Sequence, residues 1–102
     1  MNVEVNQIPY EQRQKTYLKA LAAYGDRNQM IVAMEELSEC QKEICKILRG
    51  GENFPHLAEE IADATIMLEQ MRIMFNINEL VSAFMDAKVE RLAKRVEGVS
   101  RE

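Results

Sequence analysis

The sequence predicts an all-α protein, a four-helix bundle that is completed by homo-oligomerisation. Its 102 residues include only two prolines and four glycines, and 47% of them are hydrophobic. Alanine, leucine, glutamate, lysine and methionine, which favour helix, are abundant, and no stretch shows strand-like alternation of any length. A chain of this length holds one modest core, so we expect a single domain over residues 1–102, assembled as a homodimer or a homotetramer.

Local signals predict the first two helices. The first runs from about Tyr10 to Tyr24, where Gly25 stops it and Asp26 caps the next. The second runs from about Arg27 to Leu48 and ends before the glycine pair Gly50-Gly51. A short connector then leads to the third helix.

The remaining two helices follow from proline and asparagine signals. Pro55 suits the first turn of a third helix, which continues to about Phe75. Asn76 with Glu79 resembles a capping box and would open a fourth helix that ends near Gly98.

Acidic residues interrupt the apolar faces of the second and third predicted helices. The most apolar stripe of the second helix comprises Met30, Met34, Leu37, Ile44 and Leu48, and a mixed stripe comprises Ala33, Glu36, Cys40, Glu43 and Ile47. On the third helix the corresponding stripes are Leu57, Ile61, Ala64, Leu68, Met71 and Phe75, and His56, Glu60, Asp63, Met67 and Met74. We expect the most apolar stripes to be the main buried faces.

Each of these helices carries two acids three residues apart, which project to one side. If the helices lie antiparallel, four carboxylates converge: Glu36, Glu39, Glu60 and Asp63. Four anions in a partly dry space repel one another unless a cation lies between them, and hard divalent cations prefer carboxylate oxygen. The alternative is a set of solvated acids paired with Lys42, Lys46 or Arg72.

The predicted fourth helix changes character along its length. Its inner stripe begins with Ile77, Val81 and Phe84 and continues with Lys88, Arg91 and Arg95. An apolar stripe that becomes basic indicates an anionic partner. The alternative is a frayed end whose long side chains reach solvent.

Charge and cysteine usage limit the function classes. A net charge of −4 argues against binding to a nucleic-acid polymer or to an anionic membrane. No apolar run approaches the ~18 residues of a membrane span, and MNVEVNQIPY lacks the pattern of a signal peptide. Cys40 and Cys45 lie five apart in one predicted helix and cannot bridge each other, so we expect a reduced, cytoplasmic protein.

The acidic residues resemble the signature of the MazG-type all-α nucleoside triphosphate pyrophosphohydrolases, E-E-x-x-E followed by E-x-x-D. Here it reads Glu35-Glu36-Leu37-Ser38-Glu39, twenty intervening residues, then Glu60-Ile61-Ala62-Asp63. The small residue before the aspartate and the apolar run after it, in EEIADATIML, are also similar. The resemblance covers roughly Tyr17 to Arg95 and implies a MazG-like bundle.

The resemblance implies Mg²⁺-dependent hydrolysis of a nucleoside or deoxynucleoside triphosphate to the monophosphate and pyrophosphate, with Mn²⁺ as a possible substitute. The implied metal ligands are Glu36, Glu39, Glu60 and Asp63, and Glu35 would orient water or a second ion. Lys88 and Arg91 match the basic residues that contact phosphate in that family, and Arg95 is a looser candidate.

Three other functions compete with this hypothesis. A redox di-iron bundle needs two Glu-x-x-His motifs, whereas this chain has a single histidine. Phosphoribosyl-ATP pyrophosphohydrolase uses a similar fold and stays open. A non-enzymatic helical protein that dimerises or binds a partner is also open, since seven methionines suit an adaptable interface.

Overall fold

A computed structural model describes residues 7–100, and this part of the chain is all-helical, with four helices and no strand. The helices are α1 (Tyr10–Tyr24), α2 (Asp26–Leu48), α3 (Phe54–Met74) and α4 (Asn78–Ser100). The predicted class and helix order are confirmed, and each predicted boundary lies within one or two residues of the observed one. Residues 1–6, 101 and 102 of the predicted domain, including most of MNVEVNQIPY, lie outside the described residues.

Two glycines end α2. Gly50 has a φ of +94°, and its N–H donates to the Ile47 carbonyl over 3.0 Å. The N–H of Gly51 donates to the Lys46 carbonyl over 2.9 Å, and a Cβ at Gly51 would lie 2.8 Å from that same oxygen. Both positions therefore favour glycine, and together they satisfy the last carbonyls of α2 as the chain turns back.

An asparagine caps the start of α3. The Asn53 side chain accepts a hydrogen bond of 3.1 Å from the His56 backbone N–H, and Pro55 occupies the first turn. This cap places His56 one helical turn before Glu60, at the end of α3 that faces the last turns of α2.

Asn76 has a role that differs from the predicted one. It adopts a φ of +54° and donates its N–H to the Ile73 carbonyl, while the Ile77 N–H donates to the Arg72 carbonyl over 2.9 Å. This pattern closes α3 with a left-handed residue, a position that asparagine tolerates well. Asn76 therefore ends the third helix, and α4 begins at Asn78.

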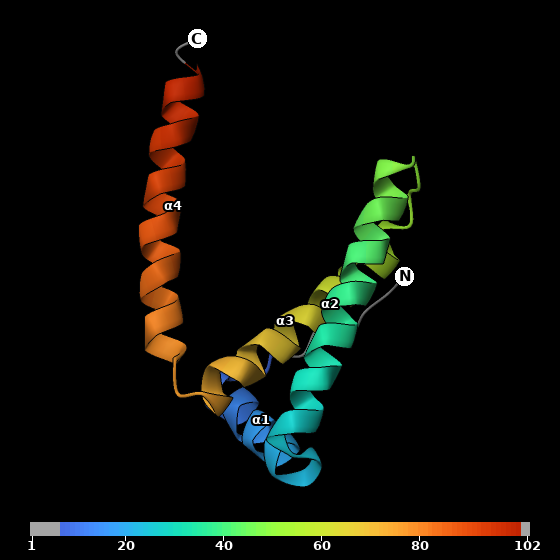
Figure 1. Ribbon diagram of the computed structural model, residues 1–102, viewed down its shortest axis with the longest axis vertical. Helices are drawn as coiled ribbons and strands as arrows, with labels where there is room; N and C mark the ends of the chain where they lie inside the picture. The colour runs from blue at the N-terminus through green and yellow to red at the C-terminus, as the bar shows by residue number, and fades with distance from the viewer. Residues whose placement is uncertain (1–6, 101–102) are drawn as a thin grey trace.

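The antiparallel pair α2–α3 forms the body of the molecule (Figure 1). The buried residues of this pair are Gln29, Ala33 and Glu43 from α2 and Ala64, Met67 and Gln70 from α3. The mixed stripe of α2 thus faces α3. The stripe predicted to be the main buried face of α2 is bare in the single chain, with Met34 71% and Leu48 82% exposed.

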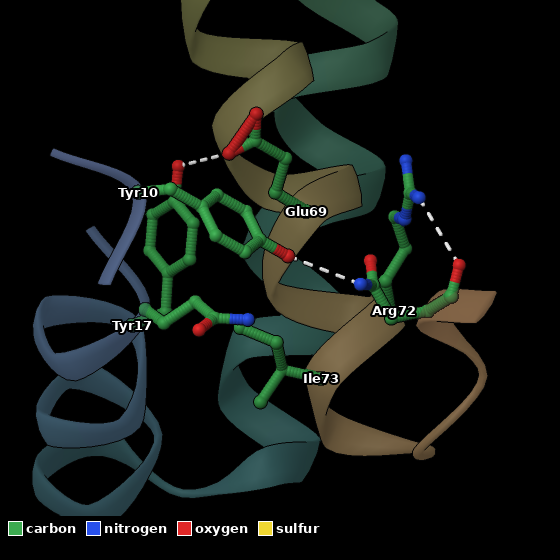
Figure 2. A pocket seen from close by; sticks show the side chains of 7 residues that line it. Tyr10, Tyr17, Glu69, Arg72 and Ile73 are labelled. Carbon is green, nitrogen blue, oxygen red and sulfur yellow. Dashed lines mark hydrogen bonds between the residues drawn. The ribbon is translucent and has the colours of Figure 1, made fainter. Parts of the chain in front are cut away.

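Helix α1 crosses the lower ends of α2 and α3 in Figure 1 and packs through Tyr17 and Leu21. The Tyr17 hydroxyl donates a short hydrogen bond to Glu69 of α3. Beside this bond lies a cavity of about 80 Å³ (Figure 2), where the Asn78 side-chain amide donates to the Tyr10 hydroxyl over 3.0 Å. These contacts join α1 to α3 and to the start of α4.

Helix α4 stands apart from α2 and, within the described residues, packs mainly against α3 (Figure 1), apart from the hydrogen bond of Asn78 to Tyr10 of α1. Its exposed large apolar residues are Leu80, Phe84, Met85, Val89, Leu92, Val96 and Val99. The radius of gyration is 16.8 Å, whereas a compact chain of this length has about 13 Å. One copy is therefore not a closed four-helix bundle, and its completion by homo-oligomerisation stays a prediction.

Candidate metal centre

Three carboxylates meet between α2 and α3. Glu36 of α2 and Glu60 and Asp63 of α3 each offer a carboxylate oxygen, and these oxygens all lie within 4.8 Å of one another. Glu60 and Asp63 lie three residues apart, so they project to the same side of α3. The antiparallel packing of α2 then places Glu36 beside them, and the structure brings together three of the four predicted metal ligands.

The electrostatics of this cluster favour a bound cation. Burial raises the pKa of Glu36, and the neighbouring charges of Asp63, Glu60, Glu39 and Glu35 raise it further. Each cause acts against the ionised form of Glu36 when no cation balances the cluster. The donor set consists only of carboxylate oxygen, which suits Mg²⁺ or Mn²⁺ rather than a metal that prefers nitrogen or sulfur.

The cluster is shielded on one side and open on the other. The Glu60 side chain is only 14% exposed, and Glu36 is half-buried, whereas Asp63 is exposed. Solvent therefore reaches the cluster on the Asp63 side. An ion held here would keep coordination positions for water and for ligand oxygens, as Mg²⁺ commonly does.

The two other predicted acids lie beside the cluster but outside it. Glu39 is 3.1 Å from Lys42 in an exposed ion pair, and Glu35 is exposed. Exposed pairs of this kind contribute roughly 0–1 kcal/mol, so Glu39 is free to leave Lys42 at little cost. Both acids still raise the pKa of Glu36, which shows that their charges act on the cluster.

The predicted phosphate-binding residues are not assembled with the cluster in one chain. Lys88, Arg91 and Arg95 are exposed on α4. Helix α4, which carries these cations, packs against α3 and stands apart from α2, which carries Glu36 (Figure 1). Their use at this site requires a second copy of the chain or a large movement of α4.

Sequence reasoning did not assign a role to the polar pairs on either side of the cluster. Glu43, only 6% exposed, lies 3.0 Å from His56 Nε2 and 3.1 Å from Lys46 Nζ. Towards the other end of α2, Gln29 Nε2 donates to Gln70 Oε1 over 2.7 Å. A regular spacing in the sequence could have indicated these pairs, because polar residues recur every seven positions on both helices. They are Gln29, Glu36 and Glu43 on α2, and His56, Asp63 and Gln70 on α3.

No protein-family model, curated protein or solved structure matches this chain. Among residues 7–100, no helix combines the length and apolar character needed to cross a membrane.

Proposed function

We propose that this protein is a Mg²⁺-dependent nucleoside triphosphate pyrophosphohydrolase of the MazG type. It would hydrolyse a nucleoside or deoxynucleoside triphosphate to the monophosphate and pyrophosphate. The observation that carries the proposal is the convergence of Glu36, from the first acidic motif, with Glu60 and Asp63, from the second. Acidic helices are common, but acids from two such motifs are seldom turned towards each other between two packed helices without a cation to balance them.

The chain's own residues have distinct tasks in this mechanism. Glu36, Glu60 and Asp63 would hold Mg²⁺, with Mn²⁺ as a substitute, and Glu39 would join them after leaving Lys42. Held by these residues, Mg²⁺ would supply charge neutralisation at the phosphates and would make water more acidic. Glu35 lies beside Glu36 on the exposed side and would accept the proton that the attacking water loses. The water oxygen would bond to the α-phosphorus. The bond from that phosphorus to the oxygen that bridges the α- and β-phosphates would break, and pyrophosphate would leave with this oxygen.

The triphosphate requires cationic side chains as well as a metal, because this chain carries a net charge of −4. Lys88, Arg91 and Arg95 on α4 are the candidates, and a homodimer or homotetramer would bring them to the acidic cluster of another copy. The chain exposes 8468 Å², whereas a compact protein of its mass exposes about 5,900 Å². The additional exposed area of this chain is larger than the ~1,600 Å² that a standard protein–protein interface buries, so there is enough surface for such an assembly.

Two alternatives differ in what they predict. Phosphoribosyl-ATP pyrophosphohydrolase would use the same cluster on another substrate. A non-enzymatic, partner-binding protein is favoured by one observation, the bare apolar side of α4. Such a protein needs no metal, so Mg²⁺ would leave its stability unchanged.

A substrate screen with two readouts separates these functions. The purified chain is incubated with Mg²⁺ and each common nucleoside triphosphate, each deoxynucleoside triphosphate and phosphoribosyl-ATP, and both pyrophosphate and orthophosphate are measured. We expect pyrophosphate without orthophosphate. Asp63→Asn should reduce the rate by at least ~100-fold while the helical circular-dichroism signal persists, and Glu90→Gln, on the exposed side of α4, is the matched control. No turnover of any of these substrates with either Mg²⁺ or Mn²⁺ contradicts the proposal.

A further inference from the structure

Polar pairs recur at regular intervals along the contact between α2 and α3. Gln29 faces Gln70, Glu36 meets Asp63, and Glu43 faces His56. Successive members lie seven residues apart on each helix, about 10.5 Å along its axis. The acidic cluster is therefore the central member of three, with one polar pair on either side.

The outer pairs join the two helices, and one of them is fully buried whereas the other is buried on its α2 side only. Gln29 and Gln70 are 7% and 5% exposed, and their amides are joined by a hydrogen bond of 2.7 Å. Gln70 also donates from Nε2 to the Met67 sulfur over 3.7 Å. Glu43 is 6% exposed and lies 3.0 Å from His56 Nε2 of α3, whose side chain is 42% exposed, and 3.1 Å from Lys46 Nζ of its own helix.

The residues between these pairs do little to define the alignment of the helices. The other buried residues of the contact are Ala33, Ala64 and Met67, which are small or flexible and tolerate sliding of one helix along the other. Buried polar pairs do not tolerate it, because a shift leaves their hydrogen-bonding groups unpaired and dry. A single polar residue in a helix–helix seam is sufficient to specify register in coiled coils.

The alignment matters because a metal site accepts small errors only. Carboxylate oxygens bind Mg²⁺ at about 2.0–2.1 Å with little variation, whereas a slip of one helical turn displaces a side chain by about 5.4 Å. Such a slip would separate Glu36 from Glu60 and Asp63.

We propose that Gln29–Gln70 and Glu43–His56 are positioning pairs that hold α2 and α3 in the one register at which the acidic cluster forms. The inference rests on the proposed function in one respect, that the cluster binds a divalent cation. Glu43 acts here through the alignment of the helices, and His56 adds a direct contact with the cluster, because its Nε2 lies 3.8 Å from Glu60 Oε1.

The first test measures Mn²⁺ affinity by calorimetry for the full chain. Glu43→His and His56→Glu alone should each weaken Mn²⁺ binding by at least ~10-fold, the scale seen when residues supporting metal ligands are lost. The double swap, Glu43→His with His56→Glu, recreates the pair across an antiparallel contact and should restore affinity to within about threefold. A swap that binds no better than the single variants overturns the inference.

The second test replaces the glutamine pair. Gln29→Leu with Gln70→Leu keeps volume and removes the hydrogen bond, so we expect an unchanged or raised midpoint of unfolding. Mn²⁺ binding should nevertheless weaken by at least ~10-fold. Gln41→Leu, an exposed glutamine of α2, is the matched control and should bind as the native chain does. If the variant with both leucines binds Mn²⁺ as tightly as the native chain does, the inference is overturned and the proposed function still stands.

The third test reads the register without any metal. Spin labels at Gln41 and Ala58, which are exposed on α2 and α3, report their separation in a chain whose Cys40 and Cys45 are alanine. The labelled chain with Gln29 and Gln70 intact should give one narrow distance distribution. Adding Gln29→Leu and Gln70→Leu should shift or broaden that distribution.

If the native chain binds no Mn²⁺, the proposed function fails. The register inference then stands or falls on this distance, and an unchanged narrow distance in the leucine pair refutes it.

Discussion

Glu36 of α2 and Asp63 of α3 turn their carboxylates towards each other, and with Glu60 their oxygens lie within 4.8 Å. We expect this contact to destabilise a metal-free chain, because like charges held close together repel one another. Residues that reduce stability while assembling one site are expected where function, rather than folding, demands them.

Neutralising Glu36 should stabilise the metal-free protein. Glu36→Gln removes one charge from the cluster, so we expect the free energy of unfolding in urea to rise by roughly 0.5–2 kcal/mol. The same change should abolish the stabilisation that Mg²⁺ gives to the native chain, because a ligand is lost. Glu59→Gln, which alters an exposed acid of α3, is the control and should change neither quantity. A less stable Glu36→Gln chain would contradict the electrostatic account.

The raised pKa of Glu36 predicts how stability depends on pH. A raised pKa means that the folded chain favours the protonated carboxyl group more than the unfolded chain does. The protonated group's contribution to stability is therefore fully present below the ordinary pKa of 4.5. That contribution is lost as the pH rises through the higher folded pKa. The difference in unfolding free energy between Glu36→Gln and the native chain should therefore increase with pH across this window and then become constant. Thermal denaturation of both chains without metal measures it, and a difference that shrinks as the pH rises is the contrary result.

Saturating Mg²⁺ should reverse that trend, because the ion binds the ionised carboxylates. The native chain should gain more stability from Mg²⁺ at neutral pH than near pH 4.5, whereas Glu36→Gln should gain little at either pH. A native chain that responds to Mg²⁺ equally at both pH values would place the bound ion elsewhere.

Local signals made the helix boundaries predictable. Gly25, the Gly50-Gly51 pair and Pro55 act within a few residues of their own position, and the structure uses each as a boundary. The direction of Glu36, Glu60 and Asp63 was also predictable, because residue spacing on a helix fixes which side chains share a face.

The packing partner of each face was not predictable. A helical wheel identifies the most apolar face of α2, which carries Met34 and Leu48, but does not reveal what covers that face. In one chain α3 covers the mixed face, where Gln29 and Glu43 are buried through specific partners. The position of α4 was missed for a related reason, because the turn at Asn76 directs the helix away from α2.

The hydrogen bond between Tyr17 and Glu69 should be a main link between α1 and α3. Tyr17→Phe removes a partly buried hydrogen bond to a carboxylate, so we expect a loss of about 1–2 kcal/mol in unfolding free energy. Tyr24→Phe, at an exposed position at the end of α1, should cost little. Urea denaturation followed by circular dichroism compares the two variants, and equal stabilities would show that Tyr17 contributes through packing alone.

The same bond should make stability depend on pH in the alkaline range. Burial and the Glu69 carboxylate raise the pKa of Tyr17 from 10.0 to about 12, although the Arg13 charge lowers it slightly. The neutral hydroxyl is favoured in the folded chain, so its contribution is complete below pH 10.0 and is lost as the pH rises through about 12. Ultraviolet absorbance should show one tyrosine that ionises later than the other two, and Tyr17→Phe should remove that late step.

The bare apolar side of α4 predicts that the chain assembles with copies of itself. This side carries Met85, Val89, Leu92, Val96 and Val99, which are spaced alternately by four and three residues, the pattern of a helix that packs along another helix. Light scattering should report a dimer or a tetramer for the native chain. Leu92→Asp places a charge in the middle of this stripe, so we expect monomers. In a monomer Lys88 and Arg91 cannot reach the acidic cluster of a second copy, so we also expect at least a ~10-fold loss in kcat/KM. Lys94→Ala, on the polar side of the same helix, should change neither measurement. A native chain that scatters as a monomer and still hydrolyses a nucleoside triphosphate would show that α4 is not needed in trans.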